Sequence, residues 1–149
     1  MKVGIDVKYS IIKAGSNDID YLKKTKLYNI FAYAHNLPES EILKINAYVD
    51  KKIPVELNEY KIIKFNKKRI GCYLVVKKDD GVMLDEIFLE TDFRNKGIGS
   101  DIINRILELN DIVYLWVYKD NINAIRLYKK FGFNIIYETD TRYYMKYSK

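Results

Sequence analysis

The sequence predicts a mixed α/β fold, in which helices cover both faces of one mixed sheet in the order β-α-α-β-β-β-α-β-α-β-β. The length of 149 residues fits one domain over residues 1–149 and is large enough to form a core. Short runs of β-branched and aromatic residues alternate with longer runs whose apolar residues recur every three or four positions. No linker rich in glycine, serine or proline divides the chain.

A first strand is expected near Val7–Lys13, and the polar cluster Asn17–Asp20 then caps a helix that runs to about Ala34. Asparagine and proline break this helix, and Pro38 is suited to the first turn of a second one.

The second helix is expected to run to about Lys51, and Pro54 is expected to end it. The elements that follow are a hairpin of strands at 60–65 and 69–76 joined by 66–68, a turn at 79–81, a strand at 82–89, a helix after residue 100, a strand at 112–118, a helix after residue 121, and strands at 134–137 and 142–147.

The most informative segment joins the strand at 82–89 to the helix that follows, and reads Phe93-Arg94-Asn95-Lys96-Gly97-Ile98-Gly99-Ser100. Glycines let a backbone approach a ligand closely, and the first amide groups of a helix have no partners within it. With Arg94 and Lys96 beside them, these groups predict a cradle for a pyrophosphate. The spacing differs from the P-loop, and Asp101 and Ile102 interrupt the glycine pattern of dinucleotide-binding folds.

A second motif follows about twenty-five residues later, after the strand at 112–118. It reads Asn121-Ile122-Asn123-Ala124-Ile125-Arg126-Leu127-Tyr128-Lys129-Lys130-Phe131-Gly132-Phe133. In their order and separation the two motifs, which with their strands cover residues 82–137, resemble the GCN5-related N-acetyltransferase (GNAT) superfamily. The resemblance implies the acyl-CoA N-acyltransferase fold and acetyl-CoA as co-substrate, with no metal.

The resemblance also implies which residues contact the cofactor. The strand before the loop is bulged in this family and splays from the next strand, so that its free backbone groups pair with the pantetheine arm. The contacts implied here are the backbone of Ile87 and Leu89, the loop residues Arg94, Asn95, Lys96, Gly97, Ile98, Gly99 and Ser100, and, from the second motif, Asn121, Ala124 and Tyr128. Asn121 is equally suited to a plain helix N-cap.

Acetyl transfer to an amine requires a base for the amine, donors for the oxyanion and an acid for the departing thiolate. Tyr128 matches the tyrosine that the family often uses as that acid, although a buried ring with a solvated hydroxyl would look the same in sequence. Asp85 and Glu86 are neighbours on one strand and are expected to point to opposite faces. Glu86 is the preferred base, and Asp85 or water remain alternatives.

The function predicted from the resemblance is acetyl transfer to a primary amine of a small molecule, by direct attack in a ternary complex. Two alternatives stay open: a protein or peptide amine, and a module that binds coenzyme A without catalysis. A small-molecule enzyme is expected to hold a compact acidic pocket, built from Glu39, Glu41, Asp85 or Glu86, whereas a protein acetyltransferase is expected to have an open groove.

Composition further limits the ligands and the cellular location that the sequence allows. The net charge of +6 comes from scattered lysines, which disfavours nucleic acid, and no apolar run approaches the roughly 20 residues of a membrane span. The single cysteine, Cys72, lies in an apolar run and fits a reducing compartment, so a cytoplasmic location is expected. His35 is the only imidazole, which argues against a zinc site. A homodimer is compatible with the sequence.

Overall fold

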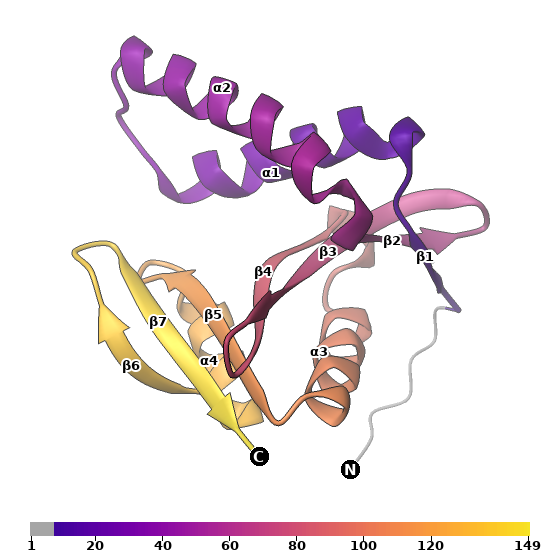
Figure 1. Cartoon of the computed structure of the whole chain (residues 1–149), viewed down its shortest axis with the longest axis vertical. Coiled ribbons are helices and arrows are strands. Elements are labelled where there is room, and N and C mark those ends of the chain that lie inside the picture. Colours follow the sequence, from indigo (N-terminus) through magenta and orange to yellow (C-terminus); the bar gives the residue numbers. More distant parts are fainter. Residues whose placement is uncertain (1–7) are drawn as a thin grey trace.

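The computed structural model describes residues 8–149 (Figure 1). Their strands form one seven-stranded sheet with the order β1-β2-β3-β4-β5-β7-β6. The pair β4–β5 is parallel and the other neighbouring pairs are antiparallel, so the sheet is mixed as expected. The strands are β1 Ser10–Lys13, β2 Tyr60–Phe65, β3 Lys68–Lys78, β4 Gly81–Leu89, β5 Ile112–Tyr118, β6 Asn134–Glu138 and β7 Arg142–Ser148. Val7, the expected start of the first strand, lies outside the described residues.

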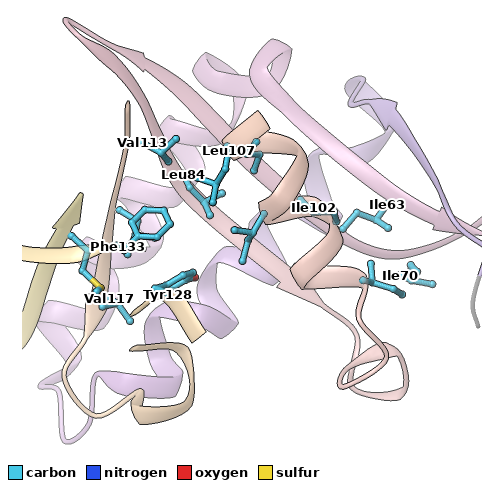
Figure 2. Packing of buried hydrophobic residues seen from close by; sticks show 14 residues of the cluster. Ile63, Ile70, Leu84, Ile102, Leu107, Val113, Val117, Tyr128 and Phe133 are labelled. Atoms are coloured by element: carbon cyan, nitrogen blue, oxygen red, sulfur yellow. The ribbon is translucent and has the colours of Figure 1, made fainter. Parts of the chain in front are cut away.

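Helices cover both faces of this sheet, so the hydrophobic core consists of two clusters, one on each face. The first cluster joins helices α1 (Ile19–Tyr33) and α2 (Glu39–Glu56) to the β2–β4 region through buried residues such as Leu22, Ile53 and Cys72. The second cluster, shown in Figure 2, joins α3 (Ile98–Leu109) and α4 (Ile122–Phe131) to the opposite face. Short 3-10 helices occupy Ser16–Asp18, Leu57–Glu59 and Thr91–Phe93.

The second helix is longer than expected, because α2 continues through Pro54 to Glu56. A proline inside a helix costs about 3 kcal/mol, since it removes a backbone donor and its ring meets the preceding turn. Val49 and Ile53 are completely buried beneath this part of α2, and burying such a side chain contributes about 1.5–3 kcal/mol. Their combined burial offsets the proline, so the expectation that Pro54 ends the helix is wrong.

The turn between β2 and β3 is tighter than expected. Asn66 and Lys67 have φ values of 49° and 65°, and Phe65 pairs directly with Lys68. Left-handed backbone at both central residues is typical of a two-residue hairpin turn that matches the twist of its strands. β3 therefore begins at Lys68, one residue earlier than the sequence indicated.

Strand β4 is bulged and then separates from β5, and both features shape the candidate functional site. Against β3, Leu74 pairs with Glu86 and Val75 with Leu84, so Asp85 is the extra residue of a β-bulge. Against β5, pairing is confined to the beginning of β4, at Val82 and Met83. The remainder of β4 therefore has an edge that β5 does not cover.

The N-terminal end of α1 is tied to the sheet by a buried carboxylate. Asp18 accepts hydrogen bonds of 2.8 Å from the Gly15 N–H and from the Arg69 guanidinium. Burial acts to raise the pKa of Asp18, but these two donors outweigh it and the pKa lies below its usual value.

We expect Asp18→Asn to lower the free energy of unfolding at pH 7 by on the order of 1–3 kcal/mol, since a charge-assisted bond is lost. A depressed pKa stabilises the fold above the unfolded-state value near 3.9, and this stabilisation disappears as the pH falls through the native value. The difference between wild type and variant in urea unfolding should therefore shrink below about pH 4. A constant difference across that range would contradict the role given to the Asp18 charge.

Candidate functional site

The glycine-containing loop leads into α3, whose first amide groups are unpaired and lie close together. Gly97 is the N-cap residue, and its φ of 87° lies in the left-handed region that favours glycine. The Asp101 N–H donates to the Gly97 carbonyl at 3.0 Å, which leaves the amides of Ile98, Gly99 and Ser100 without partners in the helix. The completely buried Ile98 side chain fixes the turn in the core. Unpaired amides at a helix start can bind an anion, and binding of a pyrophosphate here stays a prediction.

The space beside Gly99 is open within the protein. A Cβ placed there would contact only the Leu89 Cδ1 atom, at an ordinary 3.7 Å. The protein therefore leaves room at this position for a ligand to approach the backbone.

Arg94, whose contact with the cofactor stays a prediction, also makes contacts within the protein. Its Nε donates to the Leu89 carbonyl at 2.8 Å, and its guanidinium lies 5.6 Å from the ring centres of Tyr28 and Phe88. Arg94 thus ties the loop to the end of β4 and to α1. Lys96 is exposed in the same loop and supplies a cation there.

The uncovered edge of β4 carries the backbone groups of Ile87 and Leu89. The Glu90 N–H donates to Ile70 of β3 at 2.7 Å, and backbone groups alternate in direction along a strand. The groups of Ile87 and Leu89 therefore face away from β3, toward the edge that β5 has left. Their carbonyls accept bonds from Asn29 Nδ2 (3.2 Å) and Arg94 Nε (2.8 Å), so their N–H groups are the ones that remain for a ligand.

Tyr128 lies in α4 against the apolar cluster, where its ring packs on Phe133 at 5.7 Å (Figure 2). Burial raises the pKa of its hydroxyl to about 12, and the nearby charges of Glu86 and Tyr33 act in the same direction. Within residues 8–149 no hydrogen bond occupies this hydroxyl. Tyr128 therefore presents a protonated, unengaged O–H at neutral pH.

Asn121, in the second motif, has the N-cap role that the sequence allowed. Its side chain caps α4 by accepting a 3.3 Å bond from the Ala124 N–H. Ala124 itself packs against the core formed with α3 and α4. Contact of either residue with a cofactor stays a prediction.

Asp85 and Glu86 both face the α1–α2 layer, and the expectation that they point to opposite faces is wrong. The bulge at Asp85 interrupts the alternation of side chains along β4. Glu86 Oε2 lies 2.7 Å from Lys26 Nζ of α1, and Asn29 donates to its other oxygen. Asp85 Oδ2 lies 3.0 Å from Lys52 Nζ of α2. Each carboxylate of the bulge is therefore matched by one lysine of the helical layer.

Lys26 and Asn29 belong to the site but were missed in the sequence. Lys26 is only 6% exposed, and it lies between Leu22 and Ile30 on the side of α1 that faces the sheet. A lysine at four-residue spacing from two apolar residues is unusual on a buried helix face, and this was the available signal.

The compact acidic pocket expected for a small-molecule enzyme is not formed by the four carboxylates proposed for it. Asp85 and Glu86 are both paired with lysines, and Glu41 lies near Lys44 at 3.5 Å. Glu39 begins α2, thirteen residues before Lys52, which corresponds to about 20 Å along a helix. Glu39 and Glu41, at the start of α2, are therefore separated from the two paired carboxylates of the bulge.

The described part of the chain lacks two further kinds of feature. Residues 8–149 contain no group of three or more histidine, cysteine, aspartate or glutamate side chains placed to hold a metal ion. Within the same residues, no helix combines the length and apolar character that crossing a membrane requires.

Fold and site together define a protein with a bulged, splayed strand followed by an anion-binding helix start, and known proteins share this arrangement. The model of the acetyltransferase (GNAT) family matches residues 25–133. The chain belongs to this family.

Curated relatives match over a shorter segment. Spermine/spermidine N(1)-acetyltransferase of Bacillus subtilis is 33% identical over 69 residues, which cover 42% of this chain and 45% of that protein. An uncharacterized N-acetyltransferase of Methanocaldococcus jannaschii is 40% identical over 63 residues, which cover 39% of this chain and 28% of that protein. The matched segments thus span less than half of these relatives.

Solved structures match over nearly the whole chain. PaiA N-acetyltransferase from Thermoplasma acidophilum, in complex with coenzyme A, has a TM-score of 0.79 at 16% identity, covering 96% of this chain and 100% of that one. Arabidopsis thaliana Naa50, in complex with the bisubstrate analogue CoA-Ac-MVNAL, has a TM-score of 0.64 at 23% identity, covering 96% and 100%. At these identities the likeness concerns the fold.

Proposed function

We propose that this chain transfers the acetyl group of acetyl-CoA to a primary amine by direct attack in a ternary complex, with residues 1–149 acting as one domain. The observation that carries the proposal is the uncovered edge of β4, which connects the unpaired amides at the start of α3 to the region of Tyr128 and Glu86. Family membership and the coenzyme A complex of the PaiA enzyme support the same activity.

The residues present fit acetyl-CoA as co-substrate. The amides of Ile98, Gly99 and Ser100 would bind the pyrophosphate, and Lys96 would add a cation beside it. The N–H groups of Ile87 and Leu89 would bind the pantetheine arm, and the Leu89 N–H would polarise the thioester carbonyl as negative charge develops on its oxygen.

Proton movements are assigned to two side chains of this site. An alkylammonium titrates near 10, so the acceptor must lose a proton before its nitrogen can attack. We assign this proton to the Glu86 carboxylate, directly or through water, because Lys26 and Asn29 leave further lone pairs on its two oxygens. Tyr128, which keeps its proton at neutral pH, donates it to the departing thiolate.

Two acceptor classes have support. A small-molecule amine is supported by the Bacillus subtilis relative, whose name specifies spermine and spermidine. The lysine partners of Asp85 and Glu86 reduce the negative charge of this region, although Glu56 shares Lys52 with Asp85 and leaves one net negative charge. This reduced acidity favours a peptide amine over a small polycation.

Release of free coenzyme A thiol from acetyl-CoA, measured across a panel of amines, tests the proposal. The panel contains polyamines, amino sugars, aminoglycosides, amino acids and peptides with free N-termini. We expect turnover that depends on one acceptor class and on Tyr128. Binding of acetyl-CoA without turnover on any acceptor would support the non-catalytic module instead, and failure to bind would contradict the cofactor site.

Replacing Gly97 by valine is expected to reduce acetyl-CoA affinity at least tenfold. A β-branched residue is strained at a φ of 87°, and the turn that gathers the amides of α3 would have to change. Calorimetric titration with acetyl-CoA measures the effect. Gly99→Ala is the matched control, because the added Cβ would make only a 3.7 Å contact within the protein. If acetyl-CoA affinity falls in Gly99→Ala and not in Gly97→Val, the closest approach of the ligand is at Gly99.

A further inference from the structure

One face of the β5–β7–β6 part of the sheet is aromatic and belongs to neither core cluster. Along β5, Val113, Leu115 and Val117 are buried in the cluster with α3 and α4, and the residues between them face the other way. The outward residues of these strands are Tyr114, Trp116, Tyr137, Tyr144, Arg142 and Lys146, and we call this set the aromatic face. In Figure 1, α4 lies behind this part of the sheet, and α1 and α2 lie near the β1–β4 part.

The rings of the aromatic face pack on one another and form a preorganised platform. Tyr114 and Tyr144 are stacked with centroids 5.4 Å apart and planes at 4°. Trp116 lies 4.5 Å from Tyr144 and meets Tyr137 edge-on at 6.2 Å. Tyr137 is 61% exposed, and the other rings are half-buried. Rigid, partly exposed aromatic rings of this kind are typical of surfaces that bind other molecules.

The aromatic face carries positive charge that residues 8–149 leave without acidic partners. The Arg142 guanidinium lies 4.7 Å over the Trp116 ring, and Lys146 Nζ lies 5.6 Å over Tyr114. Neither cation takes part in an ion pair within the described residues, whereas Lys26 and Lys52 are both paired with carboxylates. Asp80 contacts the platform at one end, where it accepts a 2.8 Å bond from the Tyr114 hydroxyl. The face is therefore suited to carboxylates.

The aromatic face is continuous with the candidate active site at the C-terminal end of β5. Tyr118 has the same orientation as Trp116, and its ring stacks on Tyr33 of α1 at 5.3 Å. Tyr33 lies one helical turn beyond Asn29 of α1, which donates a hydrogen bond to Glu86 of the candidate active site. Arg142 pairs with Tyr118 across the sheet, and Lys146 pairs with Tyr114 at the far end. From Tyr118 to Tyr114 the strand spans about 13 Å, the length of roughly four extended residues.

We propose that the aromatic face binds an acidic peptide whose free N-terminal amine lies at the Tyr118 end. A carboxylate close to the amine would meet Arg142, a later one would meet Lys146, and apolar side chains between them would pack on Trp116 and Tyr144. This inference rests on the proposed function and assigns its acceptor class. A polyamine would instead bring positive charges against Arg142 and Lys146, and is disfavoured.

The test compares two peptides of equal length with free N-termini, one carrying aspartates at positions two and five with leucines between them, and the other carrying neutral asparagines at the same two positions. Binding is measured by anisotropy of a C-terminal fluorophore, and acetyl transfer by thiol release. We expect the acidic peptide to bind at least tenfold tighter and to have a correspondingly lower KM. Arg142→Gln should remove most of this preference, measured as the ratio of the dissociation constants of the two peptides.

Lys129→Gln is the matched control, because Lys129 is an exposed cation of α4 on the opposite side of the sheet. The preference should persist in this variant and weaken in 0.5 M salt. Trp116→Leu, checked by thermal unfolding, should weaken both peptides.

Each remaining outcome separates the two proposals. Tight binding of the acidic peptide without thiol release on any amine would overturn the enzymatic function and retain the binding surface. Turnover of spermidine with a lower KM than either peptide would overturn the surface and retain the function. Equal binding of the two peptides would overturn the surface as well, as would a dimer in light scattering that Trp116→Leu converts to a monomer.

Discussion

Replacing Tyr128 by phenylalanine is expected to lower kcat by about 10²–10⁴-fold while leaving acetyl-CoA affinity within about twofold of wild type. The substitution removes only the hydroxyl, and the ring can keep its place beside Phe133, 5.7 Å away. Without the hydroxyl, the thiolate must depart unprotonated. Thiol release under saturating acetyl-CoA gives kcat, and calorimetry gives the affinity.

The matched control for this variant is Tyr147→Phe. Tyr147 also packs on Phe133, with the ring centres 5.7 Å apart, so it tests the effect of losing a tyrosine hydroxyl next to the same ring. We expect it to retain activity. Wild-type kcat in Tyr128→Phe, or equal losses in the two variants, would exclude Tyr128 as the acid.

The pH dependence provides an independent check. A hydroxyl whose pKa is raised to about 12 stays almost fully protonated between pH 8 and pH 10. Tyr128 should therefore cause no fall in kcat between pH 8 and pH 10. A loss of activity in that range that disappears in Tyr128→Phe would contradict the environment described for this hydroxyl.

Local signals made much of the fold predictable. The hydrophobic period that distinguishes strands from helices, the cap at Asn121 and the glycine at the start of α3 depend on neighbouring residues, and the structure has them close to the predicted positions. Pro54 shows the limit of such signals. The burial of Val49 and Ile53, which overrides the proline, depends on the sheet beneath the helix.

The environment of the candidate catalytic residues was less predictable, because it depends on contacts between distant segments. A bulge adds one residue to a strand without a sequence signature of its own, and at Asp85 it brings two adjacent carboxylates to the same face. Lys26 and Asn29 reach Glu86 from sixty and fifty-seven residues away. Arg94 was identified from its motif, but its contacts with Leu89 and Tyr28 required the packed structure.

Replacing Lys26 by methionine is expected to lower the free energy of unfolding by about 3–5 kcal/mol. Lys26 and Glu86 are each 8% exposed in their side chains and form a 2.7 Å ion pair, so the variant leaves a carboxylate buried without its cation. Lys23→Met is the matched control on the same helix. Its pair with Asp50 is 3.3 Å long and more exposed, at 29% and 67%, so we expect a change of at most about 1 kcal/mol. Urea unfolding at pH 7 measures both changes.

The double variant Lys26→Met with Glu86→Gln separates the structural role of this ion pair from its chemical role. Removing both charges eliminates the unpaired carboxylate, so the double variant should be more stable than Lys26→Met alone. If Glu86 only anchors α1 to β4, turnover should return together with stability. If Glu86 accepts the proton of the amine, stability should recover while kcat stays low, because glutamine has no carboxylate to receive that proton. Full recovery of both quantities would reject Glu86 as the base and leave the deprotonation to water.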